Sequence, residues 1–134
     1  MKKVPINKNE YSEASKRSVG HVFLGSYYED IKYKCRKCRK IALFSAEEQK
    51  QAFEVRKEYM WANRQLCDEC WREMRSIKAE LQRIEDEYCR NKVSTLASKE
   101  YLKEWLRLLE LYPKYGKRMN SARIAFLKKH LKKL

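Results

Sequence analysis

The stretch Cys35-Arg36-Lys37-Cys38, separated by 28 residues from Cys67-Asp68-Glu69-Cys70, decides the fold. A Cys-x-x-Cys turn brings two sulfurs to one ion, and two such turns complete a tetrahedral set of four thiolates. One pair alone would be weak, because redox motifs share its spacing. The alternatives are two unrelated thiol pairs or a redox switch. Together the pairs predict one structural Zn²⁺ held by Cys35, Cys38, Cys67 and Cys70.

The segments around the two pairs predict a treble-clef arrangement. The first pair lies in a basic turn, the knuckle (residues 35–40), and Ile41–Phe44 suits the return strand of a hairpin. The second pair opens a long periodic segment, so Cys67 and Cys70 should stand on the first turn of a helix, where the helix N-terminus favours thiolate charge. A hairpin knuckle followed by two ligands at a helix start defines the treble clef.

A capping box predicts a helix between the two cysteine pairs. Ser45 stands three residues before Glu48, the spacing at which each side chain can bond the other residue's backbone N–H. We expect this helix over residues 46–59, with Ala52, Phe53 and Val55 among its buried positions. The apolar patch His21–Gly25 could form a short strand.

Further helices are expected after the second cysteine pair. Apolar residues recur at spacings of three or four over residues 67–90, and residues 91–97 suggest a break. Ser98 can cap the next helix, and Asn120 or Ser121 can cap the last one. The predicted fold class is therefore mainly α with a small β-hairpin. It consists of a treble-clef-like four-cysteine zinc domain followed by a helical C-terminal extension.

The chain divides into three predicted parts. Residues 1–20 are polar without clear periodicity, which predicts a flexible N-terminal arm. Residues 21–75 form the zinc-binding domain, and residues 76–134 form the helical extension with a basic C-terminal helix. The fifth cysteine, Cys89, adjoins an apolar stripe, so we expect it to be buried or half-buried.

The residues around the cysteines resemble a known family. Tyr33–Cys38, Phe44–Gln49 and Cys67–Cys70 are similar to the small prokaryotic "probable zinc-ribbon" domains. Those domains read approximately Cys-x-x-Cys-Gly, an apolar run, Phe-Thr-Ala-x-Glu-Gln, and later Cys-x-x-Cys-Arg. The resemblance covers residues 28–75 and implies zinc binding and a bacterial or phage setting. It implies little about activity.

This chain departs from the family pattern near both pairs. Arg39 stands where the family has the Gly that helps a knuckle turn. Trp71 replaces a basic residue after the last cysteine, and the connector before Cys67 is longer than usual.

The chain is strongly basic, with a formal net charge of +14. Residues 113–134 contain eight basic and no acidic side chains, and the knuckle is basic as well. Cations that neutralise phosphates release counterions, so this distribution favours DNA or RNA as the partner. The predicted contacts are Arg36, Lys37, Arg39, Lys40, Lys114, Lys117, Arg118, Arg123, Lys128, Lys129, Lys132 and Lys133.

Other roles stay open at this point. The lysines could simply solvate a helix that packs through its leucines. The apolar faces between Trp71 and Tyr112 could bind a protein partner or form a homodimer, which makes a protein-interaction adaptor the alternative function. An anionic membrane surface is a weaker option, because Phe126 is the only aromatic residue of the last helix.

The motifs argue against an enzyme. Four thiolates close the coordination sphere, whereas a catalytic zinc keeps an open position for water. No histidine lies between Cys38 and Cys67, and we identify no catalytic residues. No apolar run suggests a signal peptide or a membrane span, so we expect a cytoplasmic protein, whose thiols stay reduced.

Overall fold

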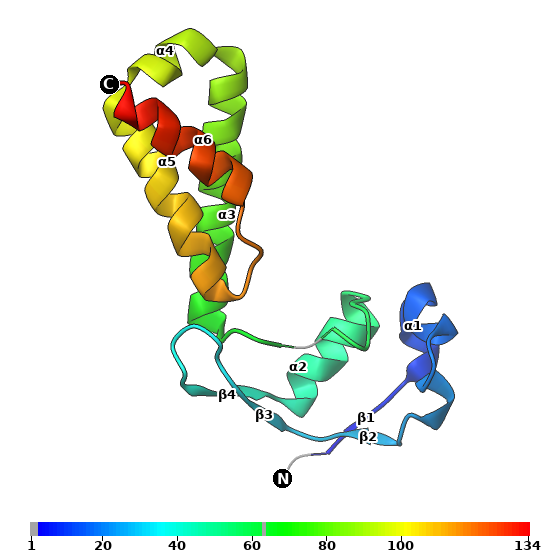
Figure 1. Ribbon diagram of the computed structural model, residues 1–134. Coiled ribbons are helices and arrows are strands. Elements are labelled where there is room, and N and C mark those ends of the chain that lie inside the picture. The colour runs from blue at the N-terminus through cyan, green and yellow to red at the C-terminus, as the bar shows by residue number, and fades with distance from the viewer. Residues whose placement is uncertain (1–2, 63) are drawn as a thin grey trace. The chain divides into compact units, whose positions relative to one another are not determined.

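The computed structural model describes residues 3–62 and 64–134 (Figure 1). The chain forms two compact units. The first unit is Met1–Cys35 with Lys40–Cys67, and the second unit is Arg36–Arg39 with Asp68–Leu134. The predicted boundary after residue 75 falls inside one continuous helix, α3 (Asp68–Arg90), so the second unit begins at the start of that helix.

Two small antiparallel sheets form the first unit's framework. β1 (Val4–Pro5) pairs with β2 (Tyr27–Tyr28), with Val4 opposite Tyr28. β3 (Ile31–Lys34) pairs with β4 (Ile41–Phe44) and forms the hairpin that carries the knuckle. The return strand predicted over residues 41–44 is thereby confirmed.

The N-terminal residues are ordered in short helical turns. These are η1 (Lys8–Glu10), α1 (Glu13–Arg17) and η2 (His21–Phe23). The strand suggested over His21–Gly25 is therefore wrong, because His21–Phe23 forms a 3₁₀ turn. Gly20, at φ 101°, enters this turn in the left-handed region that glycine adopts without strain.

Residues 3–20 differ from the flexible arm predicted over residues 1–20, of which residues 1 and 2 lie outside the described residues. Ser15 is fully buried, and its Oγ accepts a hydrogen bond from Met60 N at 2.9 Å. Tyr11 is 3% exposed. These long-range contacts fasten the segment, although its polar composition lacks any periodic apolar pattern.

The helix after β4 begins as predicted but ends early. Ser45 Oγ accepts from Glu48 N at 3.2 Å, so the predicted N-cap is confirmed. α2 (Ala46–Lys50) passes into a π-helical turn, η3 (Gln51–Val55). A π turn holds an extra residue, which rotates later side chains away from the 3.6-residue pattern. As a result Glu54 is buried, and the predicted burial of Val55 is wrong, because Val55 is 63% exposed.

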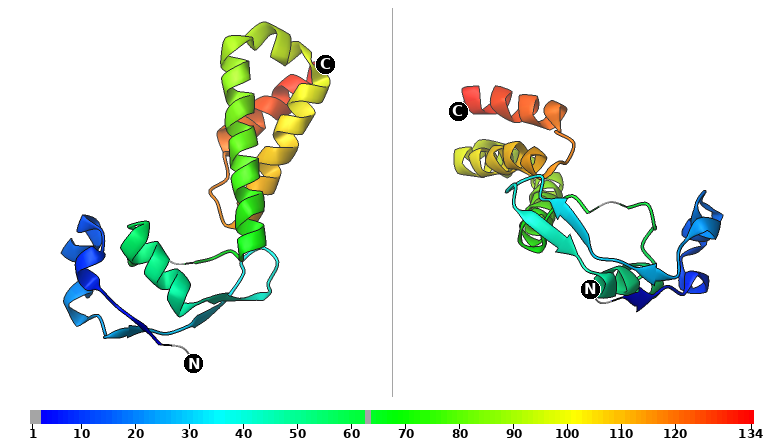
Figure 2. Two further views of the ribbon diagram at one scale, coloured as in Figure 1. Left: turned by 180° about the vertical axis from the view of Figure 1, so that it is seen from behind. Right: turned by 90° about the horizontal axis from the view of Figure 1, so that it is seen from below.

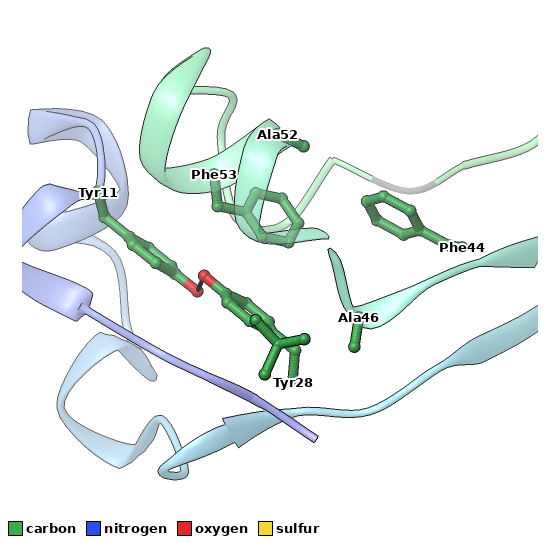
Figure 3. Close-up of a cluster of buried hydrophobic side chains, with 7 residues drawn as sticks. Tyr11, Tyr28, Phe44, Ala46, Ala52 and Phe53 are labelled. Carbon is green, nitrogen blue, oxygen red and sulfur yellow. Dashed lines mark hydrogen bonds between the residues drawn. The ribbon is translucent and has the colours of Figure 1, made fainter. Parts of the chain in front are cut away.

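The first unit's core is a cluster of rings around a polar network (Figure 3). The hydroxyls of Tyr11 and Tyr28 lie 2.8 Å apart, and Tyr28 donates to Glu54 Oε2 at 2.7 Å. Lys50 Nζ donates to Glu54 Oε1 at 2.9 Å. Burial alone would raise the pKa of Glu54, but hydrogen bonds from Tyr28, Lys50 and the backbone of Asn7 outweigh it and lower that pKa. The core therefore contains a charged, paired carboxylate.

Apart from the knuckle residues 36–39 and the segment over residues 116–120, the second unit is mainly helical (Figures 1 and 2). Ser98 and Asn120 cap helices as predicted, accepting from Tyr101 N at 3.3 Å and from Arg123 N at 3.2 Å. The suggested break over residues 91–97 is instead mostly a short helix. After α3 the elements are α4 (Lys92–Ala97), α5 (Lys99–Leu111), η4 (Tyr112–Tyr115) and α6 (Ser121–Lys132).

The apolar faces of α3, α5 and α6 pack on one another. Trp105 is 1% exposed and lies at the centre of this core. The buried set is Ile84, Leu102, Trp105, Leu108, Leu109, Ile124 and Leu127. Cys89 is exposed, so its predicted burial is wrong, because it lies beside the apolar stripe of α3 rather than on it. In the described ranges, no helix is long and apolar enough to cross a membrane.

Candidate metal centre

The knuckle is a tight turn between β3 and β4. Cys35 N donates to Lys40 O at 2.8 Å, which closes the turn. Arg39 has a φ of 67° and thus adopts the left-handed conformation. A side chain at such a position costs about 1–2 kcal/mol, which is why glycine is common there. The backbone therefore keeps the glycine-type turn, although this chain has an arginine in it.

The second pair stands at the start of α3. Cys67 directly precedes that helix, and Cys70 lies on its first turn. Within the first unit, Tyr33 Oη donates to Leu66 O at 2.9 Å, and this bond ties the residue before Cys67 to strand β3. The predicted placement of the second pair at a helix start is confirmed, and the positive end of the helix dipole favours thiolates there.

The four sulfurs form one cluster. The Sγ atoms of Cys35, Cys38, Cys67 and Cys70 all lie within 4.8 Å of one another. Cys35 and Cys70 are buried, and Cys38 and Cys67 are half-buried. A Zn–S bond of about 2.3 Å places the sulfurs of a tetrahedral site about 3.8 Å apart. The donor set and its spacing thus suit one metal ion, as the sequence predicted.

The knuckle also contacts the turn after α5, within the second unit. Lys37 Nζ lies 5.5 Å from the centroid of the Tyr115 ring. A Cβ on Gly116 would come within 2.8 Å of Arg36 Cδ, so the Arg36 side chain lies directly against this glycine. Gly116 has a φ of 83°, which ends η4 in the left-handed region. Residues 36–37 and 115–116 therefore adjoin in space.

Tyr115 is fixed where the two segments meet. It is 4% exposed, and its hydroxyl donates to Glu73 Oε2 on α3 at 3.0 Å. Burial, followed by the bond to the Glu73 carboxylate, raises the pKa of Tyr115 to about 12. The phenol is therefore neutral at physiological pH and can keep donating to Glu73.

Most of the predicted nucleic-acid contacts are exposed cations. Arg36, Lys37 and Arg39 flank the knuckle turn, and Lys40 follows it. Lys128 Nζ lies 3.7 Å from Glu110 Oε1. Within residues 3–62 and 64–134, no carboxylate pairs with the remaining exposed cations of the C-terminal segment, which are Lys114, Lys117, Arg118, Lys129, Lys132 and Lys133.

Arg123 has a structural position instead. Its guanidinium lies 5.1–5.3 Å from the ring centroids of Tyr88, Trp105 and Phe126. It also forms an ion pair with Glu85. A guanidinium that covers three rings and pairs with an acid is less available to a phosphate.

Sequence reasoning did not predict the contact between the knuckle and the Tyr115–Gly116 turn. The two segments are far apart in the chain and neither belongs to a periodic pattern. The usable signal was an aromatic residue and a glycine inside a basic segment, which marks a turn rather than a uniform charged tail.

Comparison with known proteins supports the local fold. Residues 29–79, less than half of the chain, match the family model described as "Probable treble clef domain". The match spans both cysteine pairs, so the predicted resemblance to treble-clef-like zinc domains is confirmed for this segment. A search of curated proteins and a search of solved structures gave no match.

Proposed function

We propose that this protein binds nucleic acid through a basic surface composed of residues 36–39 and 114–118, here named the clasp surface. The observation that carries the proposal is the packing of Arg36 and Lys37 against the Tyr115–Gly116 turn. Two cationic segments that the sequence separates by almost eighty residues thereby become neighbours. Clustered cations on one face are the electrostatic footprint of a nucleic-acid-binding protein.

We further propose that the metal is zinc and that its role is structural. Four thiolates are a donor set that zinc favours, and they leave no position for substrate or water. Bound zinc would supply the folding free energy that holds the knuckle at the start of α3. The protein's own contribution is to present the knuckle cations on a fixed turn, without an enzymatic step.

The packing of the second unit favours nucleic acid over the alternative adaptor role. A protein partner bound by the C-terminal helices would need their apolar faces. Those faces are occupied by the core around Trp105, Leu102 and Leu127. Among the described residues of α3 and α5, the large apolar side chain left exposed is Trp71, at 41%. The surface that remains on these two helices is polar and carries both signs of charge, and the excess of cations lies in the knuckle and after residue 113.

The clasp surface also has the charge that phosphate binding requires. It contains six cations: Arg36, Lys37, Arg39, Lys114, Lys117 and Arg118. Contacts with about six phosphates would give a log–log salt slope near −5 on duplex DNA. We therefore expect affinity that depends little on sequence and falls steeply as salt rises.

The test measures binding of a labelled duplex and a labelled single strand by fluorescence anisotropy at several salt concentrations. The variant Lys114→Ala/Lys117→Ala/Arg118→Ala should lose more than tenfold in affinity, and its salt slope should fall by about 2.7. The matched control is Lys78→Ala/Lys99→Ala/Lys103→Ala, which removes the same charge from exposed positions of α3 and α5.

Two results would overturn the proposal. One is absence of binding at about 50 mM salt, where phosphate contacts are strong. The other is an equal loss in both triple variants, because binding would then depend on net charge and not on the clasp surface.

A further inference from the structure

The first unit contains a pocket of about 630 Å³ with aromatic walls. Its floor consists of Tyr11, Tyr28, Phe44 and Phe53, each at most 9% exposed, three of them from β2, β4 and η3 (Figure 3). Its rim includes Tyr27 and Trp61, which are 54% and 53% exposed. The exposed rings of Tyr27 and Trp61 therefore offer flat apolar faces to a flat ligand.

Trp61 is held at this rim by specific contacts. Its Nε1 donates to Ser18 Oγ at 3.2 Å. A Cβ on Gly20 would lie 2.6 Å from Trp61 Cζ2, so the absence of a side chain at Gly20 lets the indole occupy this position. An indole that is fixed and yet half exposed is suited to stacking against a ligand, since little side-chain entropy remains to be lost.

The pocket also contains a buried hydrogen-bond donor that lacks an acceptor. The Arg64 guanidinium stacks on Phe44, 4.5 Å from the ring centroid. Its Nη2 is inaccessible to solvent and, within the described residues, has no hydrogen-bond partner. Glu58 Oε1 lies 3.8 Å from this nitrogen, which is too long for a hydrogen bond. A buried donor without an acceptor is costly. The Arg64 side chain as a whole is 24% exposed, so a small rotation of the guanidinium would present this nitrogen to an acceptor in the pocket.

We propose that this pocket binds an unstacked guanine base of a single-stranded nucleic acid, which rests on the proposed function and adds a base-specific contact to it. Trp61 and Tyr27 stack on the base, because every base has a π-face that aromatic side chains can bind. Arg64 donates to O6 and N7, the two neighbouring acceptors of guanine. Adenine places an amino donor beside N7, so it suits an arginine less well.

A second charged group fits this choice. Glu29 lines the same pocket, and its carboxylate can accept from the amino group of guanine. Arg64 and Glu29 thus offer a donor and an acceptor that a purely apolar ligand would not use. A duplex cannot enter, because its bases are stacked and paired.

The experiment follows the Trp61 indole N–H signal in ¹H–¹⁵N spectra of the full zinc-loaded chain. The signal is assigned with Trp61→Phe, and ligands are GMP, AMP and ribose 5-phosphate, then single-stranded 12-mers with or without one guanine. We expect GMP to shift the signal, AMP to bind at least fivefold more weakly, and ribose 5-phosphate to leave it unchanged. Arg64→Met should remove the preference for GMP, whereas Arg17→Met, at an exposed position of α1, should retain it.

The outcomes separate this proposal from the previous one. If neither GMP nor the guanine 12-mer shifts the Trp61 signal, the pocket proposal is overturned, and salt-sensitive binding would still support the clasp surface. A shift with GMP in a chain that binds neither the 12-mers nor a duplex overturns both proposals, because the pocket would then bind a free nucleotide rather than a base of a nucleic-acid strand. Equal shifts from GMP, AMP and ribose 5-phosphate exclude base recognition. If the Arg64→Met variant does not fold, Tyr27→Ala is used in its place. That variant should weaken GMP binding, because it removes a ring that stacks on the base.

Discussion

The two units are stabilised by different means. In the second unit, long helices satisfy their own backbone hydrogen bonds, so apolar packing around Trp105 is sufficient to hold them together. The first unit has strands of two and four residues and several single turns. Its backbone needs side-chain partners, such as Asp30 Oδ1, which accepts from Ala46 N at 2.8 Å, and Gln49 Nε2, which donates to Phe44 O at 3.0 Å. A unit that depends on such single contacts should be more sensitive to single changes and to metal.

Removal of the metal should produce the largest difference in stability between the two units. We expect Cys67→Ser, or chelation of the metal, to abolish the tertiary structure of the first unit while the helices of the second unit persist. Structural zinc supplies about 10–16 kcal/mol in small fingers, which is comparable to the whole stability of an ordinary domain, about 5–15 kcal/mol. Backbone amide exchange resolved by residue measures this difference. Cys89→Ser is the matched control, because that thiol is exposed and outside the cluster. Unchanged protection of the first unit without metal would contradict a structural role.

A cavity created in the core of the second unit should lower the stability of that unit. Trp105→Ala should cost about 3–5 kcal/mol, because the side chain is fully packed. Trp71→Ala should cost less than about 1 kcal/mol, since its ring is 41% exposed and contacts Arg75 at 4.9 Å. Urea unfolding followed by the helical circular dichroism signal measures both. Equal effects of the two variants would show that the helices do not form the packed core described above.

The polar network of the first unit should be sensitive to a single hydroxyl. Tyr28→Phe removes the donor to Glu54 and the acceptor for Tyr11, so a buried carboxylate loses a bond. We expect a loss of about 1–3 kcal/mol. Tyr27→Phe, at the exposed neighbouring position, is the control and should be nearly neutral. Thermal unfolding detected by near-ultraviolet circular dichroism reports the aromatic core directly.

The same network predicts a pH effect confined to the first unit. The folded-state pKa of Glu54 is lowered, so its stabilising contribution is complete above the unfolded pKa of about 4.3 and is lost as pH falls through the folded pKa. Glu54→Gln should abolish this part of the acid sensitivity. The difference in unfolding free energy between wild type and Glu54→Gln should therefore shrink as pH falls below about 4.3. A difference that does not change with pH would mean that Glu54 is not paired in the folded protein.

The smallest predicted effect is an increase in stability. Arg39→Gly should stabilise the knuckle by about 0.5–1 kcal/mol, because Arg39 adopts a left-handed conformation that costs a side chain more than glycine. For a chain of this size the gain corresponds to a rise of about 2–4 °C in melting temperature. Lys40 does not have a positive φ, so Lys40→Gly relieves no strain and should destabilise the knuckle. A fall in melting temperature for Arg39→Gly would indicate that the arginine side chain has a role that outweighs the backbone strain.

The comparison also explains what the sequence could predict. Cysteine spacing and the caps Ser45, Ser98 and Asn120 depend on residues close together in the chain, so hairpin, helix starts and metal ligands were predictable. The packing of Tyr11 against Tyr28 and of Ser15 against Met60 depends on long-range pairs that no periodicity shows. Glu54 is buried because the π turn rotates it into the core, and a helical pattern over residues 46–59 does not reveal such a turn.

The residues of the candidate site also differ in how far the sequence could identify them. The four metal ligands could be identified from their spacing alone. The assignment of Arg123 to nucleic acid rested on charge alone, whereas the structure packs it against three rings and Glu85. Charge shows where cations are abundant, but it does not show which of them are occupied inside the protein. That distinction needs the packing.

The contact between Lys37 and Tyr115 has a consequence for synthesis on the ribosome. Tyr115 follows Lys37 by 78 positions, which at about 5–20 residues per second is a delay of roughly 4–16 s. Cys70 is translated 45 positions before Tyr115, so all four thiols are synthesised before the Tyr115 ring. Translation order thus allows the nascent chain to capture its metal first and to dock its cationic turn last.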